Sequence, residues 1–172
     1  MAPHATGHAP APRHTARPDE TALTAFHACL DAAVERDDPG PGWAGEWQAR
    51  ERLRISAWVR AAYEHPLAPA ALGGDSGDIG ASGRAAQCRQ ARSLALRLEA
   101  HGTGLRPVRP APGVRAEAAV AAVWAVTRHA LAEEHRPPRE RVVLDAWTVV
   151  RELLGPEQPG TAAHRPRARS AW

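Results

Sequence analysis

The sequence predicts an all-α bundle of four to five antiparallel helices with disordered N- and C-terminal tails. Five segments repeat apolar residues at helical spacing, and none alternates apolar and polar residues as a half-buried strand does. Stretches rich in glycine and proline separate these segments and favour loops. The resulting organisation is a disordered tail over 1–18, a helical bundle domain over 19–155 and a disordered, arginine-rich tail over 156–172.

The first predicted helix covers about 19–37, with Asp19 as its N-cap. Its apolar face comprises Leu23, Phe26, Leu30, Ala33 and Val34. Asp31 and Glu35 fall on the side opposite that face, where solvent is expected. The sequence DPGPG at 38–42 ends the helix, because glycine and proline interrupt the helical hydrogen-bond pattern.

The second predicted helix covers about 43–64 and holds three of the six tryptophans. At about 100° per residue, its apolar stripe comprises Trp47, Ile55, Trp58, Val59 and Ala62. Its arginines do not share one face, as those of a phosphate-binding helix would. We therefore predict that the tryptophans anchor the core. The arginines are predicted to form a solvated collar comprising Arg50, Arg52, Arg54 and Arg60.

Glu51 interrupts the apolar stripe of this second helix. A carboxylate in that position must be paired or protonated, because an unpaired buried charge is strongly destabilising. We favour an ion pair with an arginine from a neighbouring helix, or a position just outside the edge of the bundle. The alternative is a functional site with a perturbed pKa.

Three further helices are expected over about 83–101, 114–135 and 138–154. Ser82 is the predicted N-cap of the first of these, and Pro138 opens the last. The apolar face of the helix over 83–101 comprises Ala91, Leu94, Ala95 and Leu98. That of the helix over 114–135 comprises Val120, Val123, Val126, Thr127, Ala130 and Leu131. That of the helix over 138–154 comprises Val143, Ala146, Trp147, Val150 and Leu154. Five such faces are enough to bury one another in a bundle that needs no metal or cofactor to fold.

Several kinds of chemistry are excluded by composition. All 22 basic residues are arginines, so the chain has no lysine for a phosphate-binding loop or a Schiff base. The glycine-rich stretch at 72–83 lies in a predicted loop over 65–83 and follows no strand, unlike a phosphate cradle. The absence of lysine and the many alanines, glycines and prolines are typical of proteins from high-GC bacteria.

Metal-binding and nucleophilic sites are also not predicted. His129 and Glu133 are spaced at i, i+4, but two ligands on an exposed helical face usually form only a solvated pair. Cys29 and Cys88 form no CxxC pair and are predicted to be small buried thiols of a reducing cytosol. The sequence therefore predicts no catalytic, cofactor-binding or metal-binding residue and no cofactor.

The net charge of +3 and the isoelectric point of about 9.6 raise the question of a nucleic-acid partner. Most of the excess lies in the C-terminal tail, which carries Arg165, Arg167 and Arg169 against Glu157. The last two predicted helices could form a helix-turn-helix, but acidic Asp145 on the second of them would oppose phosphate. Nucleic acid is therefore expected to bind weakly, if at all.

These observations predict a small helical protein without catalytic activity, most simply an interaction or accessory protein that binds a protein partner or itself. The alternative is a nucleic-acid-associated regulator that uses the arginine-rich tail or the last two helices. An enzyme with an unrecognised site is the least favoured class. The first residues hold no apolar run, and no apolar run is long enough to cross a membrane, so we expect a cytoplasmic location.

Overall fold

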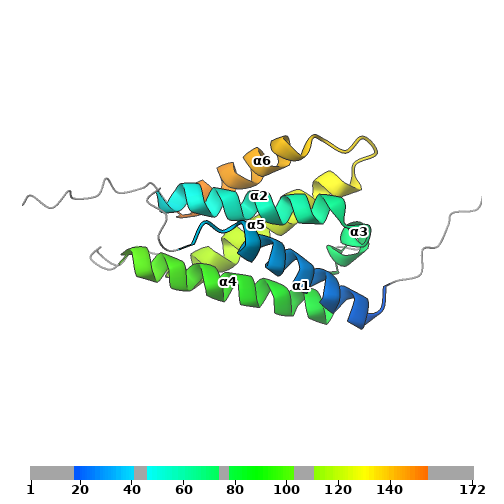
Figure 1. Cartoon of the computed structure of the whole chain (residues 1–172), viewed down its shortest axis with the longest axis horizontal. Coiled ribbons are helices and arrows are strands. Elements are labelled where there is room, and N and C mark those ends of the chain that lie inside the picture. The colour runs from blue at the N-terminus through cyan, green and yellow to red at the C-terminus, as the bar shows by residue number, and fades with distance from the viewer. Residues whose placement is uncertain (1–17, 41–45, 74–77, 103–110, 155–172) are drawn as a thin grey trace, which may run out of the picture.

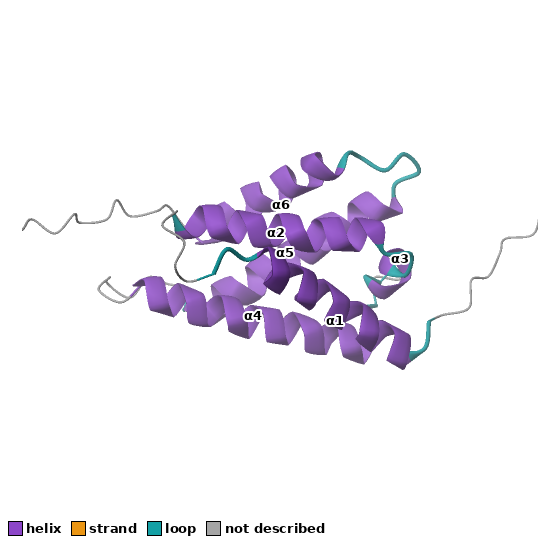
Figure 2. Ribbon diagram, viewed as in Figure 1, coloured by secondary structure: helices purple, strands orange, loops and turns teal. Residues whose placement is uncertain are grey.

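The computed structural model describes residues 18–40, 46–73, 78–102 and 111–154. The predicted disordered tails, 1–18 and 156–172, lie outside these residues apart from Pro18. Within the described ranges the chain forms helices and connecting segments without a strand, as Figure 2 shows, so the predicted all-α class is confirmed. The helices are α1 (Glu20–Asp37), α2 (Trp47–Glu64), α3 (Ala68–Ala71), α4 (Gly80–Gly102), α5 (Pro112–Ala132) and α6 (Arg139–Leu154).

The five long helices pack as a closed ring of neighbours. In Figure 1, α1 lies beside α2 and α4, and the remaining contacts run from α2 to α6, from α6 to α5 and from α5 back to α4. Small residues on α5, including Ala116 and Ala119, are fully buried and allow its neighbours to approach closely. The apolar faces of all five helices therefore point into one shared interior.

The core contains most of the apolar residues that the helical spacing predicts. Phe26 and Leu30 of α1 and Val59 of α2 are almost completely inaccessible to solvent. Trp58 is 4% exposed and lies 5.6 Å from Trp124 between ring centroids. These burials confirm that Trp58 anchors the core. Trp124 and Trp147 are buried as well, whereas Trp47 is half-buried at the start of α2.

Of the two N-caps predicted from local sequence, one is present and one is not. Asp19 is the N-cap of α1, as predicted, and its Oδ1 accepts a hydrogen bond from the Ala22 amide at 2.7 Å. The predicted cap at Ser82 is wrong, because α4 begins at Gly80 and Ser82 lies inside it. The Ser82 amide donates instead to Glu20 Oε1 of α1 at 2.8 Å, so a tertiary contact satisfies it.

Other boundaries differ from the predicted ones by a few residues. Helix α2 begins at Trp47 rather than 43, and residues 41–45 lie outside the described ranges. Helix α5 ends at Ala132 rather than 135, and the next residue is extended. The predicted loop over 65–83 contains the unpredicted short helix α3, in which proline occupies the first turn, where its missing N–H is tolerated.

The prediction of buried cysteines is wrong. Cys29 of α1 and Cys88 of α4 are both exposed free thiols. Cysteine is buried on average, but here both side chains are exposed to solvent. Neither thiol therefore contributes to the core.

Candidate ligand pocket

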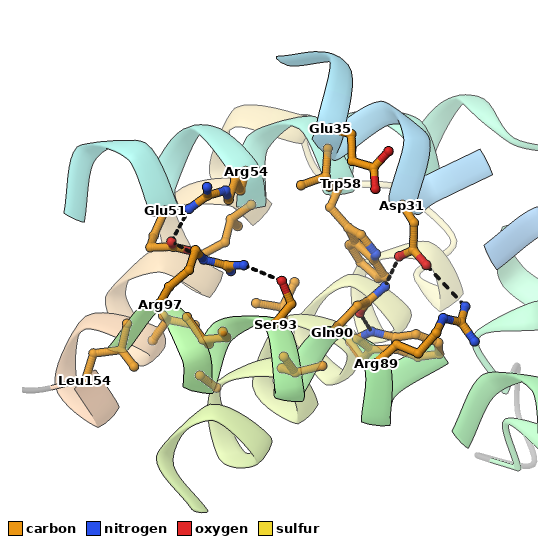
Figure 3. A pocket seen from close by; sticks show the side chains of 18 residues that line it. Asp31, Glu35, Glu51, Arg54, Trp58, Arg89, Gln90, Ser93, Arg97 and Leu154 are labelled. Carbon is orange, nitrogen blue, oxygen red and sulfur yellow. Dashed lines mark hydrogen bonds and ion pairs between the residues drawn. The ribbon is translucent and has the colours of Figure 1, made fainter. Parts of the chain in front are cut away.

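A pocket with a volume of about 340 Å³ lies in the ring interior and is lined by all five long helices. Each helix contributes residues three or four positions apart, which is the spacing that places side chains on one face. The apolar lining includes Val34, Ile55, Trp58, Leu94, Val123 and Trp124. Polar and charged side chains line the rest, and Figure 3 shows them in two groups on either side of the pocket.

The first group centres on Glu51, which is only 5% exposed. Arg97 of α4 clamps its carboxylate, with Nε donating to Oε1 at 2.6 Å and Nη2 donating to Oε2 at 2.9 Å. Arg54, one turn further along α2, donates to Oε1 as well. Arg97 also donates to Ser93 Oγ at 2.7 Å, which fixes the guanidinium on its own helix. The predicted ion pair with an arginine from a neighbouring helix is therefore confirmed.

Arg54 continues this network to the end of α1. It is 9% exposed, and its guanidinium donates both to Glu51 and to the carboxylate of Asp38. Arg50 Nε donates to Asp38 Oδ1 at 2.5 Å. Partial burial opposes ionisation of Asp38. Hydrogen bonds from Arg50, the Gly40 amide and Arg54 outweigh that effect and hold the pKa of Asp38 well below its usual range.

The predicted solvated collar of arginines is therefore wrong for part of α2. Arg54 is buried because α1 ends against α2 and brings a carboxylate to it, which no single-helix pattern reveals. Arg60 pairs with Asp37 in the same junction. Arg52 is exposed, as the collar requires.

The second group joins α1, α4 and α5. Asp31 accepts hydrogen bonds from Gln90 Nε2 at 2.8 Å and from Arg89 Nη2 at 3.1 Å. Gln90 Oε1 in turn accepts from the indole Nε1 of Trp124 at 2.9 Å. Asp31 is half-buried rather than on the solvent side, whereas Glu35 is exposed, as predicted, although both line the pocket. Packing of α4 beside α1 places this flank of α1 at the pocket mouth.

Glu35 differs from the other charged residues that line the pocket. Within the described residues it makes no hydrogen bond or ion pair, whereas Asp31, Glu51, Arg54, Arg89 and Arg97 all have partners of opposite charge. Its side chain is exposed at the rim, and Figure 3 shows it above Trp58, on the same side of the pocket as Asp31. Among the described residues that line the pocket, Glu35 is thus the one charged side chain without a partner.

His27 lies deeper in the core, beneath the second group. It is 1% exposed, stacks on Trp124 with 5.2 Å between ring centroids and meets Phe26 edge-on at 5.0 Å. Neither ring nitrogen has a hydrogen-bond partner in the described part of the chain. Burial lowers the pKa of His27 below its ordinary 6.5. Asp31 opposes this shift, and the positive charge of Arg89 reinforces it. The ring is therefore held neutral.

The remaining residues considered from the sequence lie away from the pocket. His129 Nε2 and Glu133 Oε1 are 3.7 Å apart on an exposed face. Among the described residues no group of three or more metal-ligating side chains occurs. Of the glycine-rich stretch at 72–83, residues 74–77 lie outside the described ranges.

Sequence reasoning found Glu51 but missed the α4 residues around it. Gln90, Ser93 and Arg97 are spaced three and four apart beside Leu94, so they form a polar strip along the edge of an apolar one. That strip is a usable signal, since polar residues at the core boundary of a helix must find partners or face a cavity.

Comparison with protein-family models, curated proteins and solved structures found no significant match to this chain. None of the described helices is long and apolar enough to cross a membrane. The pocket and its polar groups are consequently the features from which function is inferred.

Proposed function

We propose that the protein is a non-catalytic binding protein whose central pocket takes a small, largely apolar ligand. The observation that carries this proposal is the pocket itself, with indole and aliphatic walls supplied by five helices. A volume of about 340 Å³ falls within the range of roughly 300–1,000 Å³ that is typical of small-molecule sites. A non-catalytic role agrees with the sequence-based expectation, whereas a small-molecule ligand replaces the protein partner or self-association expected there.

The polar groups of the pocket favour binding over catalysis. A general acid or base needs a proton to exchange, and a nucleophile needs an adjacent base. The Glu51 carboxylate is instead held by two guanidinium groups, and the Asp31 carboxylate by one guanidinium and one amide. These interactions fix the pocket walls and leave neither carboxylate arranged to move a proton.

The alternative role as a nucleic-acid-associated regulator has less support. On α6 the exposed Arg141 pairs with Asp145 at 2.9 Å, so this helix offers phosphate a neutralised face. The arginine-rich tail at 156–172 lies outside the described residues, and its role remains a prediction. Deleting that tail should abolish whatever weak, salt-dependent binding occurs. The cytoplasmic location likewise remains a prediction.

A pocket-filling variant tests the proposed function. Val120 is half-buried and lines the pocket, so Val120→Phe should reduce its volume and weaken the binding of a neutral apolar probe such as 4-phenylbutan-1-ol. Val114→Phe is the matched control, because Val114 is an exposed residue on the same helix, away from the pocket. Calorimetry should show binding to the wild type and to the control, and a loss of at least tenfold in Val120→Phe. Equal affinity in all three would contradict the proposal.

A further inference from the structure

We infer that the ligand is a cationic amphiphile, with an apolar body that fills the pocket and an ammonium or similar group that pairs with Glu35. This inference rests on the proposed function and specifies the ligand class. The ligand class is inferred from the charged side chains that line the pocket and from their partners.

Each arginine that lines the pocket already has a carboxylate partner. Arg54 and Arg97 share Glu51, and Arg54 also binds Asp38, while Arg89 binds Asp31. An anionic ligand would have to compete with these carboxylates for the guanidinium groups. For Arg97 such competition would weaken the clamp on a carboxylate that is 5% exposed, and such a carboxylate is poorly tolerated without a partner.

Glu35, in contrast, is available to a cationic ligand. Its carboxylate has no partner in the described part of the chain, so a cation can pair with it without breaking an existing interaction. It stands one residue after Val34 and one turn after Asp31, both of which line the pocket. A ligand whose body lies between the helices can therefore reach Glu35 with a head group at the rim.

Trp58 adds a second feature that favours a cation. Its indole lines the pocket on the side where Glu35 lies, as Figure 3 shows. Indole rings attract cations through the negative potential of their faces, and this attraction strengthens as water is excluded. A carboxylate and an indole face on the same side of an apolar cavity favour an amine, whereas an alcohol can offer the carboxylate only a neutral hydrogen bond.

Three probes with one apolar body separate these contributions: 4-phenylbutan-1-amine, 4-phenylbutan-1-ol and 4-phenylbutanoate. They differ only in the head group, which is cationic, neutral or anionic at pH 7. Calorimetry on the full chain at low ionic strength should rank the amine first, about three- to tenfold tighter than the alcohol, with the carboxylate weakest. Added salt should reduce the preference for the amine.

Variants assign the preference to Glu35. Glu35→Gln should bring the amine to the affinity of the alcohol, and Glu35→Arg should make the carboxylate the preferred probe. Glu117→Gln, at an exposed carboxylate of α5 away from the pocket, changes the net charge equally and should leave the ranking unchanged. Because Glu35 is exposed and unpartnered in the described residues, both substitutions should keep the helical circular-dichroism spectrum of the wild type.

The outcomes distinguish this inference from the function on which it rests. If none of the probes binds, the proposed function fails and the inference fails with it. Equal affinities, or a preference for the carboxylate, would retain the binding function and overturn the cationic ligand. A preference for the amine that persists in Glu35→Gln would also overturn the assignment to Glu35.

Discussion

Glu51 of α2 and His27 of α1 are both buried ionisable side chains on adjacent helices, and the fold accommodates them in opposite ways. Glu51 accepts three hydrogen bonds from two arginines, whereas neither ring nitrogen of His27 has a partner in the described residues. Two guanidinium groups thus balance the charge of this buried carboxylate. The imidazole lies between aromatic rings, where its neutral form is favoured.

The two residues also differ in how their neighbours join the helices. The long arginine side chains around Glu51 span from α2 to α4, so these two helices are joined through side chains at the pocket wall. Around His27 the rings of Phe26 and Trp124 fill the space directly. Charged pairing thus joins helices at the pocket wall, whereas aromatic packing surrounds His27.

The largest expected effect comes from Trp58, which belongs to both regions because it lines the pocket and packs on Trp124. Trp58→Ala should destabilise the protein by about 3–5 kcal/mol, since a large buried side chain is lost and a cavity remains. Leu53→Ala, at an exposed residue of the same helix, should change stability by about 0.5 kcal/mol or less. Chemical denaturation measures both, and an unchanged midpoint for Trp58→Ala would exclude the core role.

Glu51 should give the next largest effect. Glu51→Gln keeps the shape of the side chain but removes the charge that faces Arg54 and Arg97, and it should lower the free energy of unfolding by about 1–3 kcal/mol. Glu152→Gln is the control, because Glu152 is 75% exposed and its ion pair with Arg151 should contribute less than about 1 kcal/mol. Similar losses in the two variants would mean that Glu51 is not a buried, paired charge.

The smallest of the stability effects is the pH dependence from His27. Its pKa is lowered in the folded protein, so near pH 6 the unfolded chain binds a proton that the folded chain does not. The contribution of His27 to the free energy of unfolding is fully present above its pKa in the unfolded chain, about 6.5. It falls as pH drops toward the lower pKa of the folded protein, by at most about 1.4 kcal/mol per pH unit.

His27→Leu isolates this contribution. The variant should show a smaller loss of stability between pH 7.5 and pH 5 than the wild type. Asp38 also has a lowered pKa, but its contribution is lost only as pH falls below about 4, outside this window. Identical pH profiles for variant and wild type would show that His27 does not remain neutral in the folded state.

Features that depend on a single helix could be predicted from the sequence. Apolar spacing placed Trp58 and Val59 inside, and the same spacing required a partner for Glu51. The Asp19 cap was also predictable, because its hydrogen bond spans only three residues. Each of these depends on contacts or periodicity within a single turn or helix.

Features that depend on how helices meet were not predictable in the same way. The partner Arg97 lies 46 residues from Glu51, and only the packing of α4 near α2 brings the two together. Asp31 and Arg54 looked solvent-facing on their own helices, but a neighbouring helix approaches from the side and encloses them. That Glu35 has no partner among the described residues likewise emerges only from the arrangement of the neighbouring helices.

The position of a bound neutral apolar ligand tests most directly whether the ring interior is the binding site. Nuclear Overhauser effects between the phenyl protons of 4-phenylbutan-1-ol and the indole protons of the protein measure this without a substitution. The pocket predicts cross-peaks to Trp58 and Trp124, which line it, and none to Trp147, which does not. Cross-peaks confined to exposed residues such as Leu96 or Leu144, without either pocket indole, would contradict a binding site in the ring interior.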